Sequence, residues 1–437
     1  MPSYVPYLVV GAGVHGLSVA WHLALELKAR RRGTPADILV VDKTGVGAGA
    51  SGIACGVVRN FYFQPAMTEI IRISVEVWES DPAAFGYHGC GYIAAVPKVQ
   101  AEDCEVIWQR QQEIGYRSEL YLGERDCQQH MDEIFPDFHC DGLEAVLHER
   151  QGGFATARQA VEGLAQKARE QGVALVTGVE VTGFDIRDGR VRAVHTSQGD
   201  VRCDLVILGV GPWIGRFWEM LGLPDTTDVK TPEGKVFTDV PMWTYWKLQE
   251  GEVHTGEPYQ DKHGRIPPVI HLDHVQPLVS DMTGRTVTDG PWGIYWKQDP
   301  NGVQGGAVPI RLGDSCVLEP YGHMNPEHVV GEAFADYYTA GLAWAMDRFR
   351  GKSRSYHQRP NGGIGCFTPD NFPIFDWALP NVYAIADSNH GFKMIGVGKE
   401  VAAFLMDGGR ASLRPFRLAR YAEGDLHPTS HSPYPWN

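Results

Sequence analysis

The fold is decided by the stretch Val9-Val10-Gly11-Ala12-Gly13-Val14-His15-Gly16. The apolar residues 7–10 predict a short buried parallel strand that runs into the glycines. After the glycines, apolar residues at helical spacing predict a helix over residues 17–27, and a second apolar strand follows over residues 38–42. Strand, glycine-rich turn, helix and strand in this order predict a β-α-β unit.

The glycines of this turn have the spacing G-x-G-x-x-G that is typical of dinucleotide-binding turns. Gly11 permits the tight turn, Gly13 lets the backbone approach a pyrophosphate, and Gly16 lets the helix pack closely on the strand. The helix begins near Val14 and His15, and its free N–H groups would face the phosphates.

Asp42 ends the second strand, where a carboxylate can accept hydrogen bonds from a ribose. The polar insert of residues 28–37 explains why Asp42 lies further along the chain than the usual spacing of about 20 residues. Lys43 follows directly, and we include it among the cofactor-binding residues.

The composition is that of a globular protein, with 437 residues, 43% of them hydrophobic and 21% charged. This length suggests two or three domains. Lys and Arg total 39 against 53 Asp and Glu, so the net charge is −14. Such a surface repels nucleic-acid phosphates, and we expect no nucleic-acid partner.

The eight cysteines include no C-x-x-C pair, which favours reduced thiols over a disulfide framework. No apolar run approaches the roughly 20 residues of a membrane span, and we expect no export signal. These features predict a cytoplasmic protein. His271 and His274 lie three residues apart without a third ligand at useful spacing, so we expect no metal site.

Two further α/β stretches follow the first. One contains a predicted helix over residues 156–171, a strand pair joined at Asp188-Gly189 and a buried strand over residues 204–209. The other contains a predicted strand over residues 381–386 and a helix over residues 397–406. Residues 226–345 are rich in Trp, Tyr, Pro and Gly, which favours an antiparallel sheet with long connections.

The predicted fold class is therefore α/β, with a Rossmann-like dinucleotide-binding domain interleaved with an antiparallel-sheet α+β substrate domain. We assign residues 1–90, 151–225 and 346–437 to the first domain, and residues 91–150 and 226–345 to the second. The polar, Pro-rich tail from about His427 is predicted to be loosely attached.

The sequence resembles the FAD-dependent amine and amino-acid oxidoreductases of the D-amino acid oxidase superfamily. Within it, the chain is most similar to the branch with sarcosine oxidase, N-methylamino-acid oxidases and dimethylglycine dehydrogenase. Four separated segments carry the resemblance, namely residues 9–16, 42–59, 196–213 and 362–399. The resemblance implies a flavoprotein that oxidises amines, with FAD bound by the first domain.

The resemblance also implies which residues contact the cofactor. The stretch from Ser51 and Gly52 to Arg59 would lie along the flavin, and Val181 would contact the adenine through its backbone. Further positions that match the family lie in a second cofactor-binding turn, in the stretch before the Thr368-Pro369-Asp370 marker, and in the segment facing the pyrimidine end of the flavin: Gly211, Trp213, Gly363, Ile364, Asn389, His390, Gly391, Phe392 and Lys393.

The mode of flavin attachment departs from that of the sarcosine oxidases. They attach the flavin through a cysteine five residues before the threonine of the Thr-Pro-Asp marker, a position that is Gly363 here. Cys366 lies three residues later. We predict non-covalent FAD, with a covalent link at Cys366 as the alternative.

The resemblance implies that three cationic residues take part in substrate binding and catalysis. Lys393 matches the family lysine that binds the substrate carboxylate, and Arg59 matches a flavin-adjacent arginine. Lys297 falls near the family lysine that activates oxygen, although a small shift in register would put a glycine there. A second arginine and a histidine of the family are replaced by Tyr62 and Asn301, which indicates a different substrate.

These features predict an FAD-dependent oxidase of a secondary or tertiary N-alkyl amino acid. Hydride transfer to the flavin would give an imine that water hydrolyses, and O2 would be reduced to H2O2. Three alternatives stay open: a dehydrogenase that uses another acceptor, a deaminating oxidase of a primary amino acid, and a flavin-binding protein without turnover. A purely NAD-linked dehydrogenase would leave the second and third α/β stretches without a role.

Overall fold

The first large sheet is built around the strand that precedes the glycine turn. The structure is a computed structural model that describes residues 1–321, 325, 329–357, 363–388 and 390–433. In these residues β1 (Tyr4–Val10) lies between β2 (Ile38–Asp42) and β12 (Val201–Leu208) and pairs in parallel with both. The sheet has eight strands, the others being β9 (Ala174–Thr177), β10 (Val181–Arg187), β11 (Arg190–Thr196), β23 (Ile374–Leu379) and β24 (Val382–Ala386).

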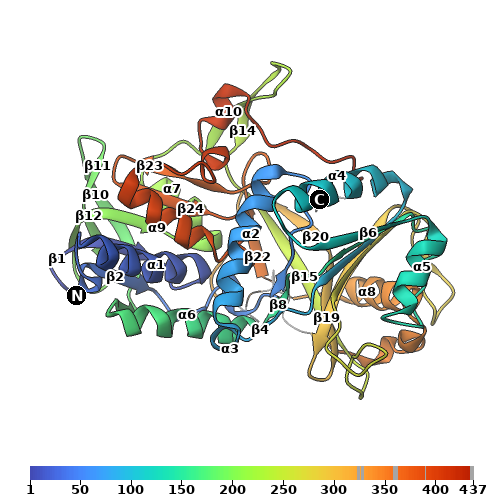
Figure 1. Cartoon of the computed structure of the whole chain (residues 1–437). Coiled ribbons are helices and arrows are strands. Elements are labelled where there is room, and N and C mark those ends of the chain that lie inside the picture. The colour runs from blue at the N-terminus through green and yellow to red at the C-terminus, as the bar shows by residue number, and fades with distance from the viewer. Residues whose placement is uncertain (322–324, 326–328, 358–362, 389, 434–437) are drawn as a thin grey trace.

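Helices pack against this sheet (Figure 1). They are α1 (Val14–Arg30), α6 (Ala157–Gln171), α7 (Ile214–Met220) and α9 (Val397–Asp407), and α1 contacts both α6 and α9. A Cβ atom on Gly16 would lie 1.9 Å from the backbone oxygen of Gly11, and Gly11 itself has a φ of 102°. The close packing predicted for Gly16 and the tight turn predicted for Gly11 are both confirmed.

The second large sheet has nine strands within the described residues. Their spatial order is β21-β15-β20-β19-β16-β5-β7-β6, and β22 also pairs with β15. All neighbours are antiparallel except β5 and β16. The strands are β5 (Tyr92–Val96), β6 (Ser118–Leu122), β7 (Ala145–Glu149), β15 (Thr244–His254), β16 (Val269–His274), β19 (Trp292–Asp299), β20 (Gly302–Gly313), β21 (Tyr356–His357) and β22 (Gly363–Phe367).

Three helices lie beside this sheet, namely α4 (Ala101–Glu113), α5 (Glu124–Asp132) and α8 (Glu332–Ala345). Between the two large sheets lies α2 (Pro65–Ser80), as Figure 1 shows. The remaining elements are short: α3 (Pro82–Phe85), α10 (Arg420–Glu423), the three-stranded sheet of β3 (Val57–Val58), β8 (Gly153–Ala155) and β4 (Tyr87–His88), and the pairs β13 (Thr226–Lys230) with β14 (Val236–Pro241) and β17 (Leu278–Val279) with β18 (Thr286–Thr288).

The predicted fold class is confirmed, because a parallel sheet with helices is combined with a mostly antiparallel one. The strand pair predicted around Asp188-Gly189 is β10–β11, and both turn residues have the positive φ that a tight hairpin requires. The division into two domains remains a prediction. Strands β21 and β22, from the last segment assigned to the dinucleotide-binding domain, pair with β15 of the other sheet.

The prediction of a loosely attached tail is wrong for the described residues of the tail. The backbone oxygen of Pro428 accepts a hydrogen bond from the Gln64 amide, at 3.0 Å. The backbone N–H of His431 donates to the Asp103 carboxylate over 2.7 Å, and its imidazole contacts the same carboxylate. A polar tail can be held by hydrogen bonds to helices, a source of order that composition does not reveal.

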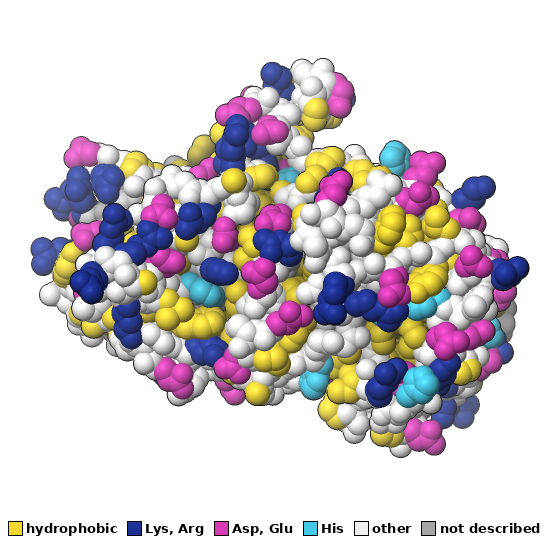
Figure 2. Space-filling model, in the orientation of Figure 1, with side chains coloured by type: hydrophobic (Ala, Val, Ile, Leu, Met, Phe, Trp, Pro, Cys, Tyr) yellow, Lys and Arg dark blue, Asp and Glu magenta, His cyan; other side chains and the backbone are white. Residues whose placement is uncertain are grey.

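On the face shown in Figure 2, Lys and Arg side chains lie among those of Asp and Glu. The expectation that nucleic acid is not a partner stays a prediction. In the described part of the chain, no helix combines the length and the apolar character needed to cross a bilayer. The eight cysteines all lie within the described residues, and no disulfide joins them.

The buried ion pair between Arg420 and Asp370 provides a test of the fold. The fully buried guanidinium donates to both carboxylate oxygens of Asp370 over 2.8 Å. Burial opposes ionisation of Asp370, but Arg420 outweighs it and the pKa of Asp370 is lowered. Asp370→Asn leaves a buried cation without its partner and should lower the free energy of unfolding by about 3–5 kcal/mol in urea titrations.

The matched control is Asp185→Asn, which removes the partner of the exposed Arg187 and should cost less than about 1 kcal/mol. The stabilisation from Asp370 is present above the ordinary carboxyl value of 3.8 and is lost as the pH falls through its lower native pKa. Equal effects of the two substitutions would contradict the assignment of Arg420–Asp370 as a structural pair.

Candidate functional site

A cavity of about 580 Å³ is lined by residues of both large sheets. One end lies at the carboxyl ends of the central parallel strands, where Val10, Val41 and Gly209 line it. Ligands of open parallel sheets bind at this edge. The other end is lined by residues of β5, β15, β16 and β19 of the second sheet.

The glycine turn and Asp42 form one end of this cavity. The Asp42 carboxylate accepts hydrogen bonds from the backbone N–H groups of Ala12 at 2.9 Å, and of Thr44 and Gly45 at 2.8 Å. Asp42 therefore also fixes the shape of the turn. Gly11 and Gly13 line the cavity together with Asp42.

Among the residues before position 60 that were predicted to bind the cofactor, four do not line the cavity, namely Val14, His15, Gly16 and Gly52. The N–H of Val14 donates to Ser51 Oγ over 3.1 Å, so the turn is tied to the stretch that was predicted to lie along the flavin. His15 is buried, and its Nε2 lies 3.5 Å from the Asp387 carboxylate. Gly52 supports a turn, because a Cβ there would lie 2.0 Å from the backbone oxygen of Gly47.

Lys43 and Trp213 contact each other at the same end of the cavity. The Lys43 ammonium lies 4.1 Å from the centre of the Trp213 ring and forms an ion pair with Glu319. The Trp213 indole N–H donates to the same carboxylate at 2.9 Å. Burial lowers the pKa of Lys43. Val181 and Gly211 also line the cavity, and their contact with the cofactor stays a prediction.

Arg59 and Lys393, which are 334 positions apart in the sequence, both line the opposite end of the cavity. The Arg59 guanidinium lies 4.7 Å from the Tyr62 ring centre and 5.8 Å from that of Tyr92. Burial lowers the pKa of the Lys393 ammonium; Tyr62 opposes this shift, while the positive charge of Arg59 adds to it. Two cations thus share one enclosed space, a suitable setting for an anionic group of a ligand.

Tyr62, which replaces a family arginine, connects these cations to His390. Its hydroxyl is 2.9 Å from His390 Nδ1, and His390 Nε2 is 3.2 Å from the backbone oxygen of Asn371. A carbonyl only accepts hydrogen bonds, so Nε2 carries the proton and Tyr62 donates to Nδ1. Burial and the charges of Lys393 and Arg59 lower the pKa of His390 to about 3, which keeps the ring neutral.

The remaining residues of the predicted flavin-facing segments are placed as follows. Gly391 and Phe392 line the cavity with Lys393, whereas Asn389 lies outside the described residues. Ile364 lines the cavity, and Gly363 has a φ of 96°. A Cβ at position 363 would also lie 2.5 Å from the Tyr321 hydroxyl. Cys366 lines the cavity as a buried thiol, and burial raises its pKa well above the ordinary value.

Lys297 is not among the residues that line the cavity. It is buried, with its ammonium 4.9 Å from the Phe154 ring centre and 3.1 Å from the backbone oxygen of Gln298. Its nearest carboxylate is Asp299, at 4.0 Å. The lysine therefore points neither to solvent nor into the cavity wall, and its role toward oxygen stays a prediction.

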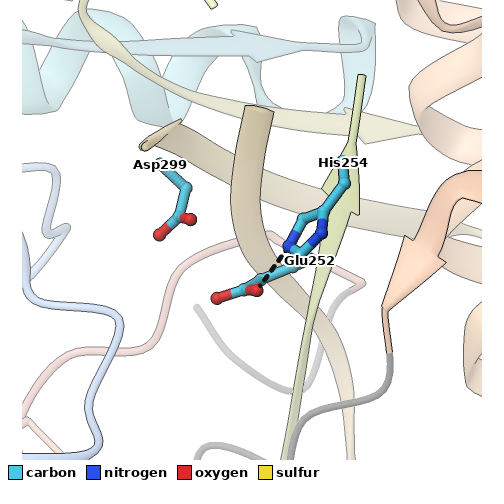
Figure 3. A group of neighbouring side chains, drawn as sticks. All are labelled: Glu252, His254 and Asp299. Carbon is cyan, nitrogen blue, oxygen red and sulfur yellow. Dashed lines mark hydrogen bonds and ion pairs between the residues drawn. The ribbon is translucent and has the colours of Figure 1, made fainter. Parts of the chain in front are cut away.

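Asp299 also belongs to a cluster with Glu252 and His254, drawn in Figure 3. One ligand atom of each lies within 4.8 Å of the others, and His254 Nε2 is 2.8 Å from Glu252. Such a group could hold a cation. The His254–Glu252 and Lys297–Asp299 pairs already place a positive or proton-donating partner beside each carboxylate, so no metal is needed to explain the cluster.

The second sheet contributes a polar wall that the sequence analysis missed. Register places Glu250, Gly306, Tyr295 and His271 in one row across four strands. The Tyr295 hydroxyl donates to the Glu250 carboxylate over 3.1 Å. A Cβ at Gly306 would lie 2.6 Å from that hydroxyl, so only glycine lets the tyrosine ring cross β20.

His271 and His274 were considered together as a possible metal pair, but they contact different groups. The His271 ring contacts Tyr92 and Asp273, whereas His274 Nε2 lies 3.0 Å from the backbone oxygen of Asp141. Alternation along β16 explains this separation. The same alternation places His271 and Asp273, which are two residues apart in the strand, on one face. This spacing is the feature of the sequence that could have predicted their association.

The residues of the cavity fit FAD. The first turn of α1 has no acidic residue, so its N–H groups are suited to a pyrophosphate. The cavity is lined both by the glycine turn and by Lys393, which lie in different parts of the chain. FAD would be held by the turn, Asp42 and the Ser51–Arg59 stretch, and its ring would supply the site of electron transfer.

Comparisons with curated proteins give relatives that oxidise methylated amino acids. The chain is 27% identical to dimethylglycine dehydrogenase of Rattus norvegicus over 222 residues, which is 49% of this chain and 24% of that protein. It is 24% identical to sarcosine oxidase subunit beta of Rhizobium meliloti, over 49% of this chain and 51% of that subunit. The chain thus matches about a quarter to a half of the length of these relatives.

A longer match, at 23% identity, covers 96% of this chain and 91% of sarcosine oxidase subunit beta of an Arthrobacter species. Among solved structures, L-proline dehydrogenase from P. horikoshii is similar with a TM-score of 0.73 and 20% identity, over 98% of this chain and 100% of that one. Glycine oxidase from Geobacillus kaustophilus gives a TM-score of 0.66 and 16% identity, over 96% and 99%. These structures share the fold.

The family described as "DAO: FAD dependent oxidoreductase" matches residues 7–404, a span that begins within β1 and ends within α9. This span includes the glycine turn, the Arg59 stretch, the polar wall of the second sheet and Lys393. The chain therefore belongs to the family of FAD-dependent oxidoreductases.

Proposed function

We propose that this chain is an FAD-dependent oxidase of a secondary or tertiary N-alkyl amino acid. The observation that carries the proposal is the meeting of Arg59 and Lys393 in the wall of the cavity that also contains the dinucleotide turn. An amino-acid carboxylate between these cations would be bound by charge-assisted hydrogen bonds. The names of relatives that act on sarcosine, dimethylglycine and 4-methylaminobutanoate support the N-alkyl class.

The protein groups around these cations would position the rest of the substrate. The rings of Phe61, Tyr62 and Tyr92 surround Arg59 and give an aromatic boundary to this end. A boundary of this kind suits the alkyl groups on the nitrogen. When bound, FAD supplies the electron-accepting ring, the substrate C–N bond becomes an imine that water hydrolyses, and O2 takes up the electrons as H2O2.

We also propose that FAD is held without a covalent bond. A cysteine at position 363 would need a left-handed backbone conformation and would meet the Tyr321 hydroxyl. Cys366, the other possible attachment point, carries a buried thiol whose pKa is raised, so it holds little of the reactive thiolate.

A dehydrogenase that passes electrons to another acceptor is the second candidate. The placement of Lys297 favours it, because this ammonium lies against Phe154 and Asp299 rather than in the cavity wall. Without the charge of Lys297 at the flavin, superoxide would be less stabilised as oxygen is reduced.

The first experiment tests the substrate class with the holoenzyme. The purified protein should be yellow, and acid precipitation should leave its FAD in solution. Without oxygen, at least one of N-methylglycine, N,N-dimethylglycine, L-proline and 4-methylaminobutanoate should bleach the flavin absorbance. A bound flavin that resists all four would contradict the proposed substrate class, while glycine and L-alanine test the primary-amine alternative.

The carboxylate clamp is tested by Lys393→Met and Arg59→Met. Each change removes a charge-assisted hydrogen bond, worth about 1.5–3 kcal/mol, and should raise the substrate Kd about 10- to 100-fold. Anaerobic stopped-flow titration gives Kd, and the absorbance ratio of flavin to protein gives FAD content. Lys399→Met is the matched control, since Lys399 is a half-exposed lysine near Glu76. Unchanged Kd in both variants would exclude the clamp.

Lys297→Met separates the oxidase from the dehydrogenase. If Lys297 acts on oxygen across Phe154, flavin reoxidation should slow at least about tenfold while reduction by substrate changes little. The measurement is single-turnover reoxidation of reduced enzyme by O2. An oxidase should also form one H2O2 per substrate oxidised, whereas slow reoxidation in the unaltered enzyme would favour the dehydrogenase.

A further inference from the structure

Three buried side chains form a hydrogen-bonded chain that ends in the cavity. The Tyr92 hydroxyl is 2.7 Å from His271 Nδ1, and His271 Nε2 is 2.9 Å from the Asp273 carboxylate. All three are at most 5% exposed. Tyr92 and His271 line the cavity, and Asp273 lies behind them. The established family activity and the carboxylate clamp use none of these three residues.

The hydrogen bonds fix the direction in which protons can move. Because an ionised carboxylate only accepts hydrogen bonds, the proton of neutral His271 is on Nε2 and faces Asp273. Nδ1 is then the acceptor for the Tyr92 hydroxyl, and the phenolic oxygen keeps its lone pairs for the cavity. Asp273 is held in place by the Gln100 amide at 3.0 Å.

An amino-acid substrate enters as an ammonium, yet its nitrogen must be neutral to release a hydride equivalent from the neighbouring carbon. The enzyme therefore needs a proton acceptor in the cavity. We propose that Tyr92, His271 and Asp273 form a proton relay that takes the ammonium proton of the bound substrate. This inference rests on the proposed function and adds to it the step that activates the amine.

The relay step is balanced in protons and involves no change of oxidation state. The substrate N–H bond breaks and an O–H bond forms on Tyr92, while the original O–H bond of Tyr92 breaks and an N–H bond forms on His271 Nδ1. His271 becomes an imidazolium, and the fully buried Asp273 carboxylate balances its charge. Tyr92 is the catalytic residue of the relay, and Asp273 is a positioning residue.

Charged and titratable groups face the relay from several elements. Arg59 lies 5.8 Å from the Tyr92 ring, and its charge stabilises the phenolate that forms briefly during transfer. Tyr62 and Tyr295 flank it, and Glu149 of β7 acts on Tyr92 from the other side. Burial raises the pKa of Glu149 to about 7, so Glu149 titrates near neutrality beside the relay.

His271→Asn and Tyr92→Phe test the relay. In the unaltered enzyme, the reduction rate constant divided by Kd should vary little between about pH 7 and 9, because the ammonium form binds and is deprotonated in place. In both variants only the free amine can react. The same ratio should fall about 100-fold at pH 7 and rise about tenfold per pH unit toward the pKa of the amine.

A binding measurement gives a readout independent of turnover. The probe is 2-amino-2-methylpropanoate, which has no hydrogen on the carbon beside nitrogen, and its binding is followed by the shift in flavin absorbance. Its Kd should be nearly constant between about pH 7 and 9 in the unaltered enzyme. In His271→Asn and Tyr92→Phe the Kd should instead fall with rising pH.

The matched control is His274→Asn, which removes another buried histidine of β16 that lies outside the cavity wall and should keep the unaltered pH profile. Tyr92→Phe leaves Glu149 in place. If the pH profile changes in both relay variants, the titration of Glu149 is therefore not its cause. If both variants keep the profile of the unaltered enzyme, the relay is excluded. If no amine reduces the unaltered enzyme, the proposed function fails instead.

Discussion

The close approach of α1 to the glycine turn is the constraint on which the rest of the site depends. No side chain fits at Gly16, 1.9 Å from the Gly11 oxygen, so the helix begins directly above the strand end. The same helix then positions the far end of the chain. Ser18 of α1 donates to the backbone oxygen of Ile395 over 2.6 Å, and a Cβ at Gly398 would lie 2.3 Å from Ser18 Oγ. The segment that carries Lys393 is therefore fixed by the turn that would hold the pyrophosphate.

The second sheet forms the opposite wall through a different constraint, which is register. Tyr295 reaches Glu250 because Gly306 leaves room above β20, and the same row continues to His271. A shift of one residue in β19 would turn Tyr295 to the other face of the sheet. The first wall is thus set by helix–strand packing and the second by strand pairing, and the cavity lies where the two meet.

The difference between these constraints explains how much could be predicted from sequence. The glycine turn and Asp42 lie within one local unit, so spacing alone predicted their association. Arg59 and Lys393 were found only through the family resemblance, because no local pattern joins residues so far apart. Tyr92, Glu250 and the role of His271 were missed, since strand order brings them together from separate segments. Lys297 was predicted to act on oxygen before the strand register around it was known. The structure places Lys297 outside the cavity wall.

Charge balance links the carboxylate clamp to the relay. Burial lowers the pKa of Lys393 and the positive charge of Arg59 adds to the shift, so an entering carboxylate would relieve the repulsion between the two cations. The ammonium of the same substrate gains nothing from Arg59 and Lys393, because their charges oppose its own. The field of the two cations would therefore favour the neutral amine, and in the proposed relay the released proton would pass to His271, which lies 2.9 Å from Asp273. Binding and activation of the amine would then be two results of one arrangement of charges.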